Sequence, residues 1–188
     1  EDGRIDGATR DDERLDEDAR KDLNRKLRAV AQAELFQGLD RKQQRLLAFS
    51  AQWYEPKTGQ VIFSAEQKAD AAYLCVSGSA GLYWPESETS NVLLSEIVPG
   101  RLIGDLSVIM NEDRTMNLVA LEDSKFLRIG AQELLAVIEN DAAVATSLLR
   151  SVASHLTGAA ERLRETRVFA VEQGVDLAEL NTRTMERR

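Results

Sequence analysis

Residues 104–116, GDLSVIMNEDRTM, bring a glycine turn, a carboxylate and a guanidinium into one short stretch. Gly104 and Asp105 precede an apolar run, which predicts a short helix whose first backbone N–H groups can receive an anion. Arg114 follows a polar turn and can return to the same place, where its planar guanidinium offers paired donors to anionic oxygens. Thr115 adds a hydroxyl group and another N–H group. Together these residues predict a phosphate-binding turn.

The carboxylate of Asp105 cannot face a phosphate, because both groups are negative. It is expected to accept from a neutral donor such as a sugar hydroxyl, or to pair with Arg114 when no ligand is bound. A nucleotide that carries ribose and phosphate satisfies both residues. The alternative is a structural Asp105–Arg114 ion pair that pins the loop, and surface pairs of this kind contribute about 0–1 kcal/mol. The residues alone leave both interpretations open.

The sequence holds one cysteine and one histidine. Cys75 lies in the apolar run AAYLCVS, which predicts a small buried side chain, and His155 lies on a predicted helix, where a surface position is expected. Neither a metal-ligand cluster nor a pair of nucleophile and base can be formed from this set. We therefore expect a protein that is not an enzyme and that needs no metal or cofactor.

The net charge of −8 is unevenly distributed along the chain. Residues 1–22 hold ten acids and five bases, which leaves twenty-two acids and nineteen bases for residues 23–188. The first segment predicts an acidic flexible leader or linker. Since no basic stripe is present and no apolar run reaches about eighteen residues, we expect no direct nucleic-acid binding, no membrane insertion and a cytoplasmic location.

Hydrophobic periodicity divides the rest of the chain into three parts and a tail. A helical period predicts N-terminal helices over residues 23–50. Short apolar runs separated by turn residues predict seven or eight strands over 51–130, assembled as one antiparallel β unit. The helical period returns over 131–172 as a helix pair, and residues 173–188 are expected to form a tail.

The second C-terminal helix carries an apolar stripe with members spaced by three or four residues, namely Val152, Leu156, Ala159 and Leu163. One interpretation is that this stripe packs on the β core of its own chain. The other is a helix–helix seam that forms a homodimer.

Three stretches of the chain resemble the cyclic nucleotide-binding domain of catabolite-activator-type regulators, protein kinase A regulatory subunits and cyclic-nucleotide-gated channels. They are ELFQGLDRKQQRLLAFSAQWYEPKTGQVIF, AAYLCVSGSAGLY and PGRLIGDLSVIMNEDRTMNLVALEDSKFLRI, and the likeness spans about residues 35–165. The resemblance implies a mainly β fold with flanking helices: an antiparallel β-roll of the jelly-roll type with N-terminal helices and a C-terminal helix pair. It also implies a phosphate-binding cassette within the roll.

Carried onto this sequence, the resemblance implies a role for six residues. Backbone N–H groups of Gly104, Leu106 and Ser107 would lie near the cyclic phosphate. Asp105 would hold the ribose hydroxyl, Arg114 would hold the phosphate charge, and Thr115 would add a hydroxyl contact. The ligand would be cAMP or cGMP.

The sequence departs from the family pattern at three positions. Asp105 stands where the family usually has a glutamate, Met116 replaces a small residue after the Arg-Thr pair, and Glu66 stands where relatives carry a glycine with positive φ. These departures imply an altered ligand choice or a loss of the ligand.

The expected function is that of a regulatory domain that binds a cyclic nucleotide and transmits the event through its C-terminal helix. The residues beyond Phe169 are too few for a DNA-binding helix-turn-helix domain, and the acidic leader fits a tether from an upstream fused domain. We therefore expect a part of a larger bacterial transporter, enzyme or signalling protein, with an ABC-type exporter as the leading candidate. The alternative is a degenerate, ligand-free domain that acts as an oligomerisation or scaffold module.

Overall fold

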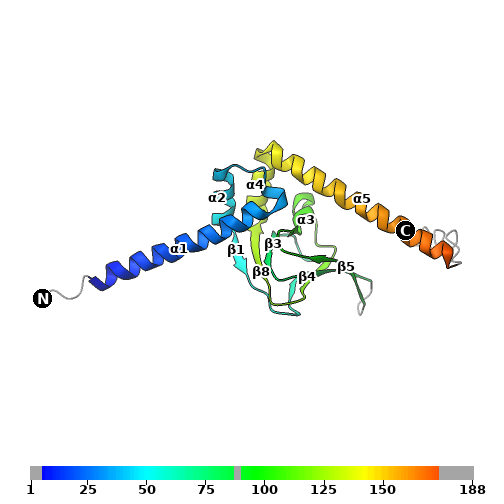
Figure 1. The fold of residues 1–188 in the computed structure, drawn as a ribbon, viewed down its shortest axis with the longest axis horizontal. Helices are drawn as coiled ribbons and strands as arrows, with labels where there is room; N and C mark the ends of the chain where they lie inside the picture. Colours follow the sequence, from blue (N-terminus) through cyan, green and yellow to red (C-terminus); the bar gives the residue numbers. More distant parts are fainter. Residues whose placement is uncertain (1–5, 87–89, 174–188) are drawn as a thin grey trace. The chain divides into compact units, whose positions relative to one another are not determined.

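The computed structural model describes residues 6–86 and 90–173 (Figure 1). The helices are α1 (Asp6–Gln32), the 3-10 helix η1 (Glu34–Phe36), α2 (Arg41–Ser50), α3 (Asp105–Met110), α4 (Ala131–Asn140) and α5 (Ala142–Glu172). The strands are β1 (Gln52–Tyr54), β2 (Val61–Phe63), β3 (Ala71–Ser77), β4 (Ala80–Pro85), β5 (Asn91–Ile97), β6 (Leu102–Ile103), β7 (Asn117–Ala120) and β8 (Lys125–Gly130). Almost all of the predicted tail lies outside the described residues, so its prediction stays open.

The strands form two four-stranded antiparallel sheets, in the orders β1-β8-β3-β6 and β2-β7-β4-β5. Apart from the β4–β5 hairpin within the second sheet, consecutive strands lie in different sheets, so the sequence winds back and forth between the two layers. This arrangement is the predicted antiparallel β-roll with flanking helices, and the fold class is confirmed. Strand β6, only two residues long, is the one strand that the hydrophobic pattern did not reveal as a separate run.

The core lies where the inner faces of the two sheets meet. Its buried side chains come from both layers and include Ile62, Phe63, Tyr73, Cys75, Ile97, Leu118 and Phe126. Cys75 is a free, buried thiol, as the sequence predicts, and burial raises its pKa to about 11. Burial of this apolar set supplies the main driving force for closing the roll.

Helix α1 begins at Asp6, so it includes most of the segment that the sequence predicted as a flexible leader. The prediction relied on the lack of an apolar face, but charge pairs at helical spacing support this helix instead. Lys21 pairs with Glu17 at 2.9 Å, and Lys26 pairs with Asp22 at 3.2 Å. The acidic segment is therefore helical from Asp6 onward.

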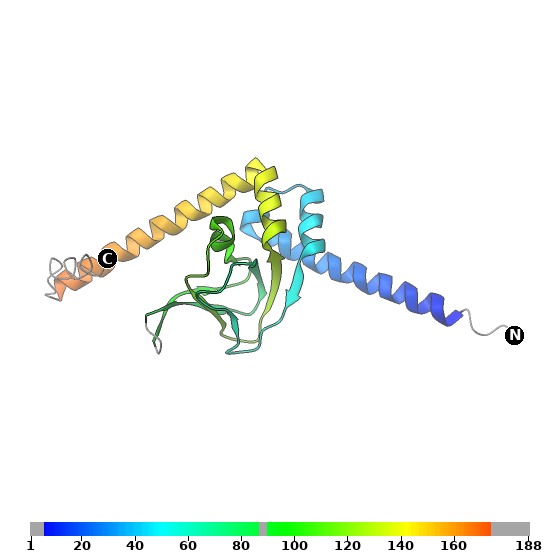
Figure 2. The ribbon, with the colours of Figure 1, turned by 180° about the vertical axis from the view of Figure 1, so that it is seen from behind.

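Helices α1, α2 and α4 lie beside the first sheet (Figure 2). A capping box between Asp40 and Gln43 begins α2, which buries Leu47. The amide of Gln43 also donates to the carboxylate of Asp141 at 2.8 Å, which ties α2 to the start of α5. The described residues up to Ser147 form one compact unit, which thus includes α4 and the first turn of α5.

The second compact unit begins at Leu148, and its described part is the rest of α5. Leu149, Leu156 and Leu163 of this helix are exposed. The side chains of His155 and Ala159 lie outside the described residues, so their predicted positions are not tested. Among the residues that the structure describes, none of the helices combines the length and the hydropathy needed to cross a membrane.

Candidate functional site

The register of the first sheet brings the glycine turn of the predicted cassette against the start of β3. In the antiparallel β3–β6 pair Ile103 lies opposite Tyr73, so Gly104, directly after β6, reaches the start of β3. Gly104 has φ of +82° and is the N-cap residue between β6 and α3. A residue with a side chain would be strained in this conformation. The predicted glycine turn and short helix are confirmed.

The guanidinium of Arg114 fills the space between this turn and β3. Its Nη1 donates to the carbonyl of Gly104 at 2.9 Å, and its Nη2 donates to the carbonyl of Ala71. The ring of Phe63 lies beneath the guanidinium, with its centroid 4.3 Å from Cζ. Arg114 is only 3% exposed, although arginine is rarely fully buried unless it is paired. Sequence reasoning placed Arg114 beside Gly104, and the structure confirms this contact.

The positive charge of Arg114 is poorly balanced by the protein. The carboxylate of Asp70 lies 4.0 Å from Nη2, and Asp70 is itself engaged at 2.6 Å by Arg128. Burial lowers the pKa of Arg114 from its usual value, while the charges of Tyr73, Asp70 and Asp105 act in the opposite direction. Among the described residues, nothing accepts a hydrogen bond from its buried Nε. The site can therefore stabilise an additional anion.

The backbone of Arg114 is held by the turn that precedes β3. The N–H group of Arg114 donates to the carbonyl of Gln67 at 2.8 Å, and the N–H group of Glu66 donates to the carbonyl of Arg114 at 2.7 Å. Glu66 has φ of +69°. The expectation that this position requires a positive φ is thus correct, and the turn keeps that conformation with a glutamate in place of glycine. Strain of this kind costs about 1–2 kcal/mol.

The other predicted site residues lie around this turn. Asp105 is half-buried as the first residue of α3, and its charge is the smallest of the influences on the pKa of Arg114. Ser107 is half-buried, whereas Leu106 is 44% exposed and Thr115 is exposed. The ligand-binding roles of these residues remain predictions. Met116 is half-buried beside them.

Sequence reasoning missed three groups that define the environment of Arg114, namely the carboxylate of Asp70, the carbonyl of Ala71 and the ring of Phe63. They precede Arg114 by more than forty residues. Only the pairing of strands brings them to the cassette, so no local signal in the sequence could have identified them. Within residues 6–86 and 90–173, no group of three His, Cys, Asp or Glu residues is placed to hold a metal ion.

Comparison with known proteins identifies the domain. The family model described as "Cyclic nucleotide-binding domain" matches residues 55–141. An uncharacterized NTE family protein of Mycobacterium tuberculosis is 28% identical over 152 residues, which are 80% of this chain and 25% of that protein. This chain thus spans a quarter of the length of that relative. This relative gives no support to the expected fusion with an ABC-type exporter.

Solved structures share the fold. The crystal structure of Thermus thermophilus catabolite activator protein matches with a TM-score of 0.63 and 27% identity, over 72% of this chain and 63% of that one. The regulatory domain of Toxoplasma gondii PKA, crystallised with cAMP, matches with a TM-score of 0.66 and 16% identity, over 73% of this chain and 52% of that one. Residues 55–141 of this chain therefore match the cyclic nucleotide-binding domain family, and the structure shares the fold of its solved members.

Proposed function

We propose that this domain is a regulatory sensor that binds a cyclic nucleotide, cAMP or cGMP, at Arg114. The observation that carries the proposal is the buried guanidinium with an unpartnered Nε and a distant carboxylate. A buried cation is costly unless an anion and hydrogen bonds compensate it. A cyclic phosphate would supply both the charge and the acceptor atoms.

The remaining contacts of the proposed site follow from the cassette. The backbone N–H groups of Gly104, Leu106 and Ser107 would bind the phosphate, and the hydroxyl of Thr115 would add a contact to the ligand. Asp105 would accept a hydrogen bond from the ribose. Its carboxylate is one methylene shorter than that of glutamate, and a charged hydrogen bond contributes about 1.5–3 kcal/mol. Asp105→Glu should therefore increase the affinity by roughly ten- to a hundredfold if the shorter side chain fails to reach the sugar.

Isothermal titration calorimetry with cAMP and with cGMP tests the proposal directly. Arg114→Gln should lose most of the binding, while Arg45→Gln, an exposed arginine on α2, serves as the matched control and should bind like the wild type. Circular dichroism of each variant establishes that the fold is retained. If the wild-type protein binds neither nucleotide at millimolar concentration, the proposed function is wrong.

The signal would pass through α5 to a partner. Leu149, Leu156 and Leu163 recur every seven residues and are exposed, which is the pattern of a two-helix seam. We propose a homodimer through this helix. Sedimentation equilibrium should give a dimer for the wild type and a monomer for Leu156→Glu, whereas Leu15→Glu, at an exposed leucine of α1, should remain dimeric.

We propose further that the domain regulates a larger bacterial protein to which it is fused, and that it performs no chemistry itself. The length of the M. tuberculosis relative, four times the matched region, supports a fused arrangement. A difference of about 1–3 kcal/mol in ligand affinity between two states of the helices would suffice for regulation. The test is to measure the output of the full-length protein with and without the nucleotide, in the wild type and in Arg114→Gln.

One observation favours the alternative of a ligand-free scaffold. Both Nη atoms of Arg114 already donate to backbone carbonyls, and the guanidinium rests on Phe63, so the loop is held together without a ligand. In that case Arg114→Gln would weaken folding but no nucleotide would bind to the wild type. The same calorimetry and a denaturation curve therefore separate the two functions.

A further inference from the structure

A pocket lies between α1 and the end of the first sheet. It has a volume of about 300 Å³, which is at the lower end of the range for small-molecule sites. Its lining residues come from α1 and from three strands or their ends, namely Arg25, Arg28, Ala29, Gln32, Trp53, Glu55, Val76 and Lys125. Val76 is near the end of β3, whereas the Arg114 contact is at Ala71, where β3 begins. The pocket is therefore separate from the cassette.

The indole ring of Trp53 forms a fixed wall of this pocket. Its Nε1 donates to Oδ1 of Asp22 at 2.7 Å, and the same carboxylate accepts from Arg25 at 3.2 Å and pairs with Lys26 at 3.2 Å. Arg25 and Lys26 thus fix the position of the Asp22 carboxylate, and this carboxylate fixes the orientation of the indole through the hydrogen bond from Nε1. The ring orientation is set before any ligand arrives, so little conformational entropy would be lost when a flat molecule stacks against it.

The charges around the pocket leave one cation available. Arg25 is bound to Asp22, and Lys125 is bound to Glu55 at 2.9 Å. For Arg28, by contrast, no hydrogen bond or ion pair is recorded with any described residue. Arg28 therefore presents five N–H donors to the pocket mouth without an internal acceptor.

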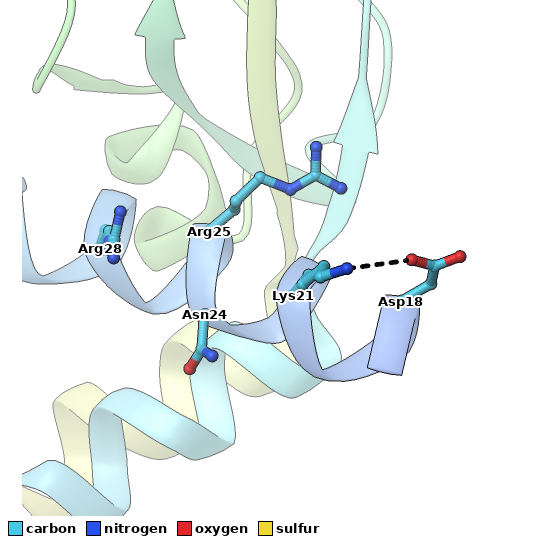
Figure 3. Close-up of a pocket in the computed structure, with 5 residues that line it drawn as sticks. All are labelled: Asp18, Lys21, Asn24, Arg25 and Arg28. Atoms are coloured by element: carbon cyan, nitrogen blue, oxygen red, sulfur yellow. Dashed lines mark ion pairs between the residues drawn. The ribbon is translucent and has the colours of Figure 1, made fainter. Parts of the chain in front are cut away.

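Gln32 lies one helical turn beyond Arg28, on the same face of α1, and its amide also has no recorded partner among the described residues. Arg25 and Arg28 additionally line a pocket along the flank of α1 (Figure 3). In this view Arg25 extends from α1 on the side of the strands, and Asn24 leaves the helix on the opposite side. Arg28 and Gln32 are both exposed and supply polar donors to the pocket, while Trp53, Ala29 and Val76 supply apolar surface.

We propose that this pocket binds a small planar organic anion, with its charged group on Arg28 and Gln32 and its flat body against Trp53. A carboxylate, sulfonate or phosphate group would pair with the guanidinium in a bidentate manner. The apolar part of the ligand would contact the indole face and the side chains of Ala29 and Val76. The site is additional to the cyclic nucleotide site and does not depend on it.

The pairing of an aromatic wall with a single free guanidinium selects this ligand class. An inorganic anion would use Arg28 but gain nothing from the indole. A neutral aromatic molecule would use the indole but leave the guanidinium without a partner. Only a molecule with both parts satisfies both features of the pocket, and it should bind more tightly than either fragment.

Fluorine NMR on protein labelled with 5-fluorotryptophan tests this proposal. The chain has two tryptophans, and the variant Trp84→Phe assigns the resonance of Trp53. Titration with 1-naphthoate should shift the Trp53 resonance to saturation and leave that of Trp84 in place. The neutral analogue 1-naphthalenemethanol should bind at least roughly tenfold more weakly, because it lacks the charged hydrogen bonds.

Two arginine variants on α1 complete the experiment. Arg28→Ala should weaken naphthoate binding by roughly tenfold or more, whereas Arg20→Ala, an exposed arginine outside the pocket, should leave it unchanged. Both positions are exposed, so both variants should fold. The proposal is overturned if naphthoate leaves the Trp53 resonance unmoved, if the neutral analogue binds equally well, if inorganic phosphate reproduces the shift, or if Arg28→Ala binds like the wild type.

Discussion

The substitution Gly104→Ala tests whether the glycine turn and Arg114 form one structural unit. Gly104 has φ of +82°, and a Cβ atom at this position would overlap Nη1 of Arg114. Gly59→Ala is a matched control, because Gly59 has φ of +80° but an added Cβ would meet nothing within 4 Å. The two variants share the backbone strain and differ in the displacement of the guanidinium.

The magnitudes follow from these two contributions. An alanine in the left-handed region costs about 1–2 kcal/mol, and both variants should lose this amount of unfolding free energy. Displacing Arg114 also removes its hydrogen bond to the carbonyl of residue 104, which contributes about 1.5–3 kcal/mol because the donor is charged. Gly104→Ala should therefore be less stable than Gly59→Ala by about 1.5–3 kcal/mol.

Urea denaturation monitored by circular dichroism measures the difference, since a change in midpoint at constant slope reports a change in stability. Calorimetry with cAMP and cGMP on the same samples should show that Gly104→Ala loses nucleotide affinity while Gly59→Ala retains it. Equal stability of the two variants would refute the inferred contact between the turn and the guanidinium. Equal nucleotide affinity would refute the role of that contact in binding.

Three further predictions concern charged and titrating groups. Asp70→Asn should increase nucleotide affinity by at most about fivefold, because an exposed carboxylate no longer competes for Arg114; calorimetry measures the change, and weaker binding would contradict it. Lys57 lowers the pKa of Asp123 to about 2, so the stability from this carboxylate is present above its usual pKa of 3.8 and is lost as the pH falls toward 2. As the pH is lowered from 3.8 to about 2, the melting temperature should accordingly fall less in Asp123→Asn than in the wild type. Cys75, whose pKa is raised to about 11 by burial, should resist iodoacetamide at pH 8 in the folded protein and react after unfolding, as mass spectrometry would detect.

The strand-rich architecture could be predicted because each strand of the roll leaves a local trace. Turn residues such as Gly59, Gly78 and Gly100 have positive φ and separate runs of apolar residues, so the pattern marks most strand ends. The contact between Gly104 and Arg114 could be predicted for the same reason, since the two residues lie ten positions apart in one loop.

Helix α1 shows where local pattern was insufficient. The sequence has almost no apolar residues before Leu23, and the prediction took that as the mark of a flexible leader or linker. Ion pairs such as Lys21–Glu17 stabilise helical turns without burying apolar surface, and the structure has the helix beginning at Asp6.

The amino-acid sequence by itself determined most of the helices and strands and the glycine turn before α3, because turns, caps and periodicity act over a few residues. Tertiary structure decided what surrounds Arg114 and what surrounds Trp53. Asp70 and Ala71 reach the guanidinium through strand pairing, and Asp22 fixes the indole from a helix thirty-one residues earlier. Such contacts depend on the register of the sheet and on the packing of α1, which no local run of residues encodes.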